Sequence, residues 1–543
     1  MNSTLLLFCA YFPVVLLIWL MAKKHGLAAC YALPLSAAVV YMLCMLVFPF
    51  APILVHANVI LGVLLAATPI LIIASAILLF KVLDKTGAML VIKSHLNQVS
   101  TNAVAQLVIV GWAFAFLIEG ASGFGTPAAL AAPILIGLGF EPLRVAVLVL
   151  AMNSVPVSFG AVGTPTWFGF SPLGLSETER LAIGKLSAII HMVCSFIIPL
   201  LALSVLLSWR VIKANLLYIW LCISATMVPF LVVSFYSYEF PSLIGGACGL
   251  FASIVLAKKG VGLSSSVGSS NAPTAVSANH TSNVHTMSLV KATFPLWGTI
   301  AVLVLTRLPS LPFKAWLTSA EPAISMSIEH LGYFSLSAYG ALQWQSILHT
   351  GIDWRLNLLY IPALLPFWLV SMIMLLVCKS RLQLAKEVMF STLLQMRKPI
   401  FALIGALVFV SLMMMGGAHS PVYLIGIHLA DTFGGAWLFF APFLGALGAF
   451  FSGSATISNL TFGAIQTEVA ARVDLPQQLV LALQSVGAAL GNMVCINNIV
   501  AVASVLGLQK AEGPILRKTI VPMMVYAVLA GSTGTLYWFL FMA

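Results

Sequence analysis

The amino-acid sequence predicts an all-α polytopic membrane protein with about 12 to 14 transmembrane segments, some of them broken or re-entrant. Of its 543 residues, 61% are hydrophobic and only 7% are charged, whereas soluble proteins carry about 25% charged residues. The apolar residues form many blocks of about 20 residues, which is the length that an α-helix needs to cross a bilayer. This composition excludes a soluble globular protein.

The basic residues lie in short clusters between the apolar blocks. Loops rich in Lys and Arg are typical of the cytoplasmic side of a membrane. The formal net charge of +11 therefore reflects membrane topology, and we expect no nucleic-acid partner. The first apolar block, residues 5–21, has Lys23 and Lys24 behind it and no basic residue before it. We interpret it as a retained span with the N-terminus outside, because a signal peptide would carry its charge first.

The expected spans follow one another as apolar blocks separated by polar or basic loops. They are residues 5–21, 27–50, 57–83, 101–118, 145–152, 184–209, 216–236, 243–257, 293–308, 361–378, 401–415, 437–450 and 520–541. Residues 258–291, rich in Ser, Asn, Gly and Ala, predict a flexible cytoplasmic linker between the parts 1–257 and 292–543. We expect 309–355 to form an outside loop with short helices, and the basic stretch 379–398 to form a helix on the cytoplasmic surface.

One span ends in a carboxylate followed by a glycine-rich run, Glu119-Gly-Ala-Ser-Gly-Phe-Gly-Thr-Pro127. A second irregular segment, Asn153–Pro165, contains two prolines and two glycines. A charge and an opened backbone are tolerated at membrane depth only inside protein or beside a water-filled cavity. Both segments are therefore expected to be broken helices that line a binding site.

The C-terminal half carries counterparts of both segments. Val149–Val155 reads VLAMNSV and matches Val480–Val486, which reads VLALQSV, and Ser122-Gly123 corresponds to Ser452-Gly453 at nearly the same offset. The charge pattern gives opposite directions to the spans that precede the two Ser-Gly pairs. We infer an inverted repeat, the architecture of many secondary transporters, in which the ends of broken helices face an anionic substrate near the midplane.

The expected pocket lining comes from these four segments and consists of polar residues and glycines. It comprises Ser122, Gly123, Gly125, Thr126, Asn153, Ser158, Thr164, Ser452, Ser454, Thr456, Asn459, Gln484, Asn492 and Asn497. Small residues also pack transmembrane helices together, so that alternative stays open for any one of them.

Glu119 is the candidate proton carrier, because burial favours the protonated form of a carboxyl group and a nearby substrate anion favours it further. The alternative is a structural carboxylate that caps the opened backbone. His191 lies in the middle of an expected span, and we interpret it as a hydrogen-bonded core histidine, with a proton relay as the alternative.

These motifs resemble the L-lactate permease family. The resemblance rests on Glu119–Pro127, Asn153–Pro165 and Gly448–Gly463, and it extends over nearly the whole chain. It implies a symporter of the bacterial inner (plasma) membrane that takes up L-lactate, or a related 2-hydroxy acid such as glycolate, with protons. Two positions depart from the family pattern: Ala455 stands where members commonly have an acidic or amide residue, and Asn492 where they commonly have Lys. Because loss of a buried cation weakens the attraction for a carboxylate, a different small organic anion is the alternative substrate.

Other classes of function account for fewer of these features. Gly120-Ala-Ser-Gly123 matches the nucleophile motif of rhomboid-like intramembrane serine proteases, with His191 as the conceivable base, but a protease core needs far fewer spans. A channel would need a filter motif or a ring of charge, and neither occurs. The eight cysteines are scattered without a CxxC pair, so we expect no metal site, disulfide framework or cofactor. The expected partners are a small carboxylate, protons and the lipid bilayer; a homo-oligomer is compatible with the sequence, which does not fix the oligomeric state.

Overall fold

The computed structural model describes residues 3–22, 27–123, 126–264, 287–307, 311–319, 321–361, 364–378, 382–508 and 511–542. Contacts within the chain group it into two compact units. The first unit consists of Met1–Ala88 and Ala292–Thr432, and the second of Met89–Lys291 and Phe433–Ala543. Each unit therefore takes one segment from each half of the chain, so the units are not the repeats 1–257 and 292–543, and that division stays a prediction. Most of the expected linker 258–291 lies outside the described residues.

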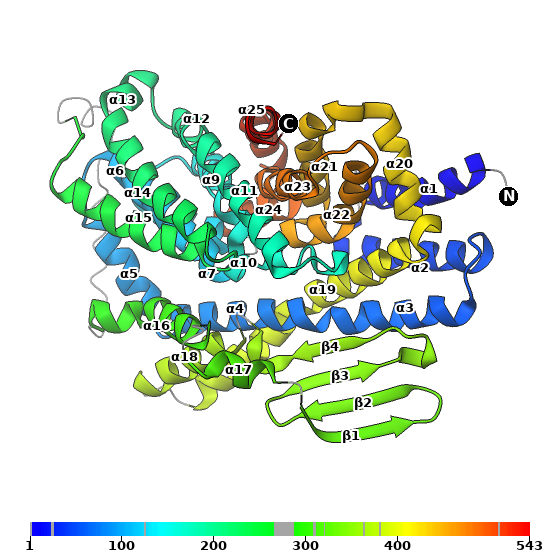
Figure 1. Cartoon of the computed structure of the whole chain (residues 1–543). Helices are drawn as coiled ribbons and strands as arrows, with labels where there is room; N and C mark the ends of the chain where they lie inside the picture. The colour runs from blue at the N-terminus through cyan, green and yellow to red at the C-terminus, as the bar shows by residue number, and fades with distance from the viewer. Residues whose placement is uncertain are drawn as a thin grey trace. The chain divides into compact units, whose positions relative to one another are not determined.

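The first unit is a set of apolar helices with one small sheet (Figure 1). Its helices are α1 (Ser3–Ala22), α2 (Ala29–Leu46), α3 (Pro52–Leu65), α4 (Ala67–Lys85), α16 (Leu289–Arg307), α17 (Phe313–Thr318), α18 (Leu364–Val377), α19 (Leu382–Met414) and α20 (Pro421–Phe433). The expected surface helix at 379–398 and the expected span at 401–415 are not separate. From Leu382 onward they form the single helix α19, which continues through Pro399 at the junction between them.

The sheet of the first unit was not predicted. Its strands β1 (Pro322–Ile328), β2 (Gly332–Ser337), β3 (Ala341–Gln345) and β4 (Trp354–Asn357) are antiparallel and lie in sequence order. The prediction of short helices in 309–355 is thus wrong for all but α17 and short 3-10 turns. Apolar and polar residues alternate from Ile324 to Ile328 in β1, which is the strand period of two and not a helical one.

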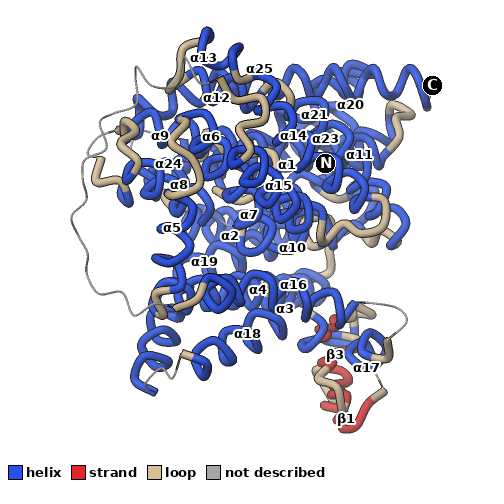
Figure 2. Tube along the Cα trace, turned by 90° about the vertical axis from the view of Figure 1, so that its left-hand side faces the viewer, coloured by secondary structure: helices blue, strands red, loops and turns tan. Residues whose placement is uncertain are grey.

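The second unit is helical throughout its described residues (Figure 2). Its first segment contains α5 (Ala88–Asn97), α6 (Ala103–Leu107), the π-helix η1 (Val108–Phe114), α7 (Ala115–Ser122), α8 (Thr126–Gly137), α9 (Pro142–Met152), the 3-10 helix η2 (Pro156–Phe159), α10 (Gly160–Trp167), the 3-10 turn η3 (Ser171–Leu173), α11 (Glu177–Ser195), α12 (Ile198–Ser204), α13 (Trp209–Ala214), α14 (Leu216–Ser234) and α15 (Pro241–Lys258). Its second segment contains α21 (Trp437–Ser452), α22 (Ala455–Arg472), α23 (Gln477–Gly491), α24 (Ile496–Val505) and α25 (Glu512–Phe541).

Local sequence sets several of the helix boundaries in this unit. α11 begins at a capping box, in which Ser176 and Glu179 satisfy each other's backbone N–H groups. α6 begins at Asn102, whose side chain accepts hydrogen bonds from the N–H groups of Val104 and Ala105. The π-helix η1 interrupts the regular helix directly before the segment that carries Glu119, and such irregularities are common at functional sites.

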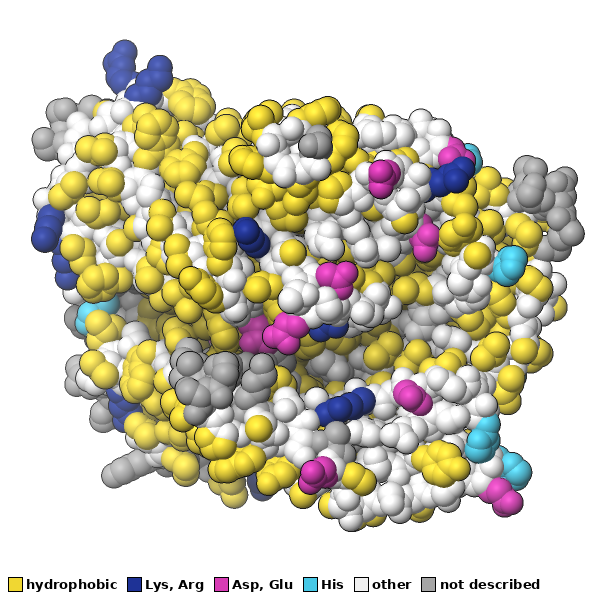
Figure 3. Space-filling model, in the orientation of Figure 1, with side chains coloured by type: hydrophobic (Ala, Val, Ile, Leu, Met, Phe, Trp, Pro, Cys, Tyr) yellow, Lys and Arg dark blue, Asp and Glu magenta, His cyan; other side chains and the backbone are white. Residues whose placement is uncertain are grey.

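The described helices are long and apolar enough for a polytopic membrane protein. Eight of them could cross a bilayer, or up to nine if the bent pair Pro142–Met152 and Pro156–Leu173 forms one span. Four shorter apolar helices lie at 5–20, 30–46, 289–303 and 364–377. Together these helices agree with the expected range of about 12 to 14 transmembrane segments, in which broken spans were counted. On the face drawn in Figure 3, hydrophobic side chains cover wide areas between scattered charged side chains.

Candidate functional site

Each of the two Ser-Gly pairs ends a helix at a glycine with positive φ. α7 ends at Ser122 and α21 at Ser452, and each is followed by a glycine with positive φ, +60° at Gly123 and +76° at Gly453. The N–H of Gly123 donates to the carbonyl of Glu119, and the N–H of Gly453 donates to that of Ala449. An L side chain is strained at such φ values, so both breaks require glycine. The paired motifs of the sequence are therefore paired helix ends in the structure.

The Asn153–Pro165 segment is broken more severely. After η2 the backbone passes through three consecutive left-handed residues, with φ of +44° at Ala161, +57° at Val162 and +70° at Gly163. A β-branched residue with positive φ is a genuine outlier. Strain of this kind persists where the surrounding structure enforces it, and it concentrates at functional sites. The C-terminal counterpart simply turns between the end of α23 at Gly491 and the start of α24 at Ile496.

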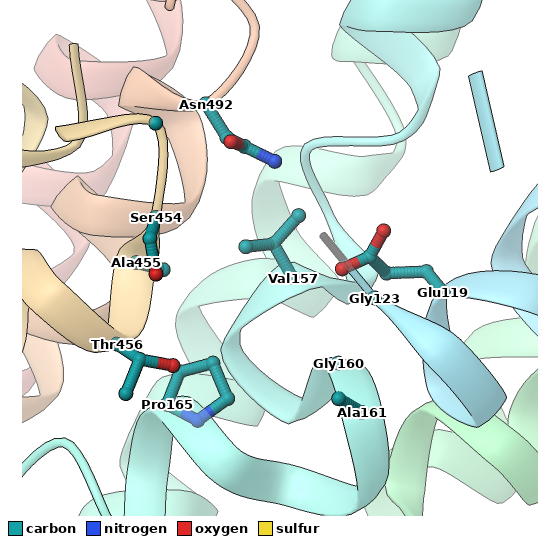
Figure 4. A pocket seen from close by; sticks show the side chains of 11 residues that line it. Glu119, Gly123, Val157, Gly160, Ala161, Pro165, Ser454, Ala455, Thr456 and Asn492 are labelled. Atoms are coloured by element: carbon teal, nitrogen blue, oxygen red, sulfur yellow. The ribbon is translucent and has the colours of Figure 1, made fainter. Parts of the chain in front are cut away.

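All four breaks in the second unit meet around one cavity of about 290 Å³, a volume that includes the space toward its opening (Figure 4). It is lined by Glu119, Gly123, Val157, Gly160, Ala161, Pro165, Gly453, Ser454, Ala455, Thr456 and Asn492. This lining contains one carboxylate and no Lys, Arg or His.

Glu119 supplies the carboxylate and is 2% exposed. Asn153 donates a hydrogen bond from Nδ2 to Oε2 of Glu119 over 2.9 Å. The other amide atom, Oδ1 of Asn153, is buried and has no hydrogen-bond partner among the described residues. Gly160 makes room for the carboxylate, because a Cβ at this position would overlap Oε1 of Glu119.

The opposite wall of the pocket is the N-terminus of α22. Ser454 caps this helix by accepting a hydrogen bond from the N–H of Ile457 over 3.3 Å. The next two residues, Ala455 and Thr456, belong to the first turn, whose N–H groups have no partner within the helix. The aligned peptide dipoles place a partial positive charge here, which favours an anion.

Asn492 adds an oriented donor. Its Oδ1 accepts a hydrogen bond from Nδ2 of Asn498 over 2.5 Å, and its backbone carbonyl accepts a second from the same group. This pairing fixes the amide, so that the Nδ2 group of Asn492 points into the pocket, toward the side where Glu119 lies (Figure 4). An N–H donor and a helix N-terminus together can hold a carboxylate without a cationic side chain.

The structure separates the predicted site residues into two groups. Those that line the pocket are Glu119, Gly123, Ser454, Thr456 and Asn492. Those that lie elsewhere are Asn153, Ser158, Thr164, Ser452, Asn459 and Gln484. Gly125, and the side chains of Ser122, Thr126 and Asn497, lie outside the part of the chain that the structure describes.

Several residues of the second group form hydrogen bonds with the elements that make up the pocket wall. Asn459 donates to the carbonyl of Pro165, Gln484 donates to Ser458, and Thr164 donates to the carbonyl of Ala161. All three acceptor atoms belong to pocket-lining residues or to the helix α22 that carries some of them, which places these side chains one layer away from the cavity.

Sequence reasoning missed the apolar and backbone part of the wall. Val157, Ala161 and Pro165 contribute methyl groups and ring carbons, which give no polar signal in a sequence. Their only sequence signal is their position inside a segment whose prolines and glycines indicate an opened helix. The interpretation of His191 as a buried, hydrogen-bonded histidine agrees with the structure, where its ring contacts Ser158 and Tyr526.

Comparison with known proteins places the chain in a family. The model of the family described as L-lactate permease matches residues 7–541. A putative L-lactate permease of Haemophilus influenzae is 47% identical over 526 residues, which cover 97% of each chain. An L-lactate permease of Escherichia coli is 28% identical over 88% of this chain and 86% of its own, and a glycolate permease of the same organism is 24% identical over 87% and 84%. The chain belongs to the L-lactate permease family.

Proposed function

We propose that this multi-pass membrane protein takes up a small monocarboxylate, L-lactate or a related 2-hydroxy acid such as glycolate, together with a proton. The observation that carries the proposal is the buried carboxylate of Glu119 facing a helix N-terminus and an amide donor across a small cavity. The names of the relatives support the substrate class, since they include both lactate and glycolate permeases. The inner membrane, the outside N-terminus and assembly as a homo-oligomer belong to the same proposal.

The coupling follows from the charges in the pocket. Two unit negative charges 4 Å apart repel each other by about 4 kcal/mol at an effective dielectric constant of about 20. An ionised Glu119 therefore disfavours the substrate carboxylate, and no cationic side chain in the described lining offsets that repulsion. Protonation removes the repulsion and gives Glu119 an O–H group that can donate to the substrate. Proton and anion thus bind together, and each increases the affinity for the other.

Asn153 suits both protonation states of Glu119. Its amide presents a donor on one side and an acceptor on the other. In the present orientation Nδ2 donates to the carboxylate, and Oδ1 has no partner among the described residues. Turned over, the same side chain accepts a hydrogen bond from the protonated acid when the pocket is empty. When the O–H group donates to a substrate, Nδ2 can donate to the other carboxyl oxygen as it does now, so Asn153 keeps a hydrogen bond to Glu119 in either charge state.

Uptake into lipid vesicles tests the proposal. Purified protein is reconstituted with a pH-sensitive dye in the lumen, and an inward gradient of L-lactate is applied. We expect acidification of the lumen, and we expect uptake of labelled L-lactate to be inhibited by glycolate and other 2-hydroxy acids in a competition panel, and not by dicarboxylates. Failure to transport any acid of the panel would overturn the substrate class. Uptake that follows a sodium gradient and leaves the lumenal pH unchanged would overturn proton coupling.

Replacing Asn492 with Asp probes the anion side of the pocket. Asp keeps an oxygen for the hydrogen bond from Asn498 but exchanges the pocket-facing donor for a negatively charged acceptor. We expect KM for L-lactate to rise by about 10- to 100-fold, because a donor is lost and a like charge is added. The measurement is the concentration dependence of uptake in vesicles. The control is Asn498→Ala, which frees the amide of Asn492 but leaves its donor in place and should have a smaller effect; equal KM values for Asn492→Asp and wild type would contradict this role.

The intramembrane-protease alternative requires His191 to act as the base that activates Ser122. The two ring nitrogens of His191 lie within hydrogen-bond distance of Ser158 and Tyr526, so neither is available to activate another serine in this arrangement. Uptake that survives in Ser122→Ala, in a protein that shows no proteolytic activity, would dispose of this alternative.

A further inference from the structure

A buried hydrogen-bonded chain runs behind the pocket wall and has no part in the coupling described above. His191 of α11 is fully buried. Its Nδ1 lies 2.5 Å from the hydroxyl of Tyr526 in α25, and its Nε2 lies 2.8 Å from Oγ of Ser158 in η2. The hydroxyl of Ser158 in turn contacts Ser485 of α23, whose carbonyl and hydroxyl oxygens both lie 3.1 Å away.

The donor and acceptor groups of these residues allow only one direction of hydrogen bonding along this chain. A serine hydroxyl has one hydrogen to donate and two lone pairs to accept with. Ser158 donates to the carbonyl of Ser485 and accepts from the Ser485 hydroxyl, so only an acceptor position is left for His191. Nε2 of His191 therefore carries the hydrogen, and in a neutral imidazole Nδ1 then accepts from the hydroxyl of Tyr526. The chain runs from Tyr526 through His191 and Ser158 to the backbone of α23.

Aromatic packing holds the histidine ring in place. Phe230 lies edge-on to the His191 ring, with centroids 6.3 Å apart, and also edge-on to Phe159, with centroids 5.2 Å apart. Phe159 and Val157 flank Ser158 in η2, and Val157 lines the pocket. The position of Ser158 consequently determines where the Val157 side chain stands in the pocket wall.

We propose that His191 and Tyr526 are positioning residues, which hold the broken segment of the first half against α23 of the second half and thereby set the pocket wall at Val157. Both are full participants in the chain, since removing either leaves a buried polar atom unpaired. Neither residue carries the transported proton, because the chain ends on a backbone carbonyl that cannot pass a proton on.

The first test does not depend on transport. Val157→Cys serves as a probe in full-length protein whose exposed Cys248 and half-buried Cys378 are replaced by Ser, and its reaction rate with a small uncharged thiol reagent is measured. We expect the rate to change by at least about threefold when His191→Leu or Tyr526→Phe is added. His191→Gln should restore it, because an amide also offers one donor and one acceptor. Ser195→Ala is the matched control, since the one hydrogen bond of this buried hydroxyl among the described residues goes to the carbonyl of Met192 in the same helix, α11.

The second test rests on the proposed function and separates positioning from proton transfer. In vesicles, His191→Leu and Tyr526→Phe should raise KM for L-lactate by about tenfold, an effect of the size expected for one lost buried hydrogen bond. His191→Gln should transport with near-normal KM and should still acidify the lumen. If the wild-type protein transports no 2-hydroxy acid, the proposed function is wrong. The positioning role of His191 and Tyr526 is then decided by the thiol reaction rates.

Two outcomes would overturn the inference itself. Equal thiol reaction rates in all backgrounds would mean that the chain does not set the pocket wall. Loss of proton movement in His191→Gln, with uptake retained, would make His191 a proton carrier and not a positioning residue.

Discussion

Glu119→Gln is expected to retain binding and exchange of L-lactate but to lose all uptake driven by a proton gradient. The amide has nearly the size of the carboxyl group, and its Nε2 can donate to a substrate carboxylate as the protonated acid does. It cannot release a proton, so the pocket stays permanently in its proton-loaded form. Exchange of internal for external lactate should keep its KM within about threefold and lose its pH dependence, whereas the wild type should bind more weakly as pH rises and Glu119 ionises.

The matched control for this substitution is Glu141→Gln. Glu141 is exposed and pairs with Arg144 at the surface, so the same chemical change there should leave coupling intact. Accumulation of lactate against its gradient by Glu119→Gln, at the wild-type level and with the wild-type pH dependence, would show that another group carries the proton.

Gly160→Ala is expected to reduce transport strongly without unfolding the protein. Gly160 has φ of −64° and ψ of 156°, a conformation that alanine adopts readily. The added methyl group would overlap Oε1 of Glu119 and lie 3.2 Å from its Cδ. Forcing an extra methyl group into a packed site costs about 1 to 3 kcal/mol, which corresponds to a loss of about 5- to 150-fold in kcat/KM for uptake.

A second substitution shows whether the loss comes from the carboxylate. Shortening the acid in Glu119→Asp withdraws the carboxyl group from the new methyl, so Gly160→Ala should cost less in that background than in the wild type. Gly137→Ala is the control, because a Cβ at Gly137 meets nothing within 4 Å. Additive losses in the double variant would argue that Gly160 acts elsewhere than on Glu119.

The helix breaks could be predicted from the sequence because a bilayer tolerates a charge or an opened backbone only where protein or a water-filled cavity surrounds it. A carboxylate at Glu119 and the prolines of Asn153–Pro165 are costly in hydrocarbon, so their presence indicated a site. The pairing of Ser122-Gly123 with Ser452-Gly453 followed from a repeated pattern, and both pairs end a helix at a glycine with positive φ.

The assignment of individual side chains to the pocket was harder to predict. Composition cannot tell which of two neighbouring residues faces a cavity, and in η2 it is Val157 that lines the pocket while Ser158 turns toward His191. A broken helix has no fixed period from which such orientation could be deduced. The sheet β1–β4 was missed for a different reason, since its alternating residues lie within a loop that was expected to be helical.

The most direct test is the number of protons taken up when L-lactate binds to the purified protein, measured by titration calorimetry in buffers of different ionisation enthalpy. Binding of the anion should favour the protonated form of Glu119, so the wild type should take up close to one proton per lactate at a pH where this group is ionised, and fewer as the pH falls. Glu119→Gln should bind lactate with no proton uptake. The same uptake in Glu119→Gln as in the wild type would contradict the assignment of Glu119 as the site where proton and substrate are coupled.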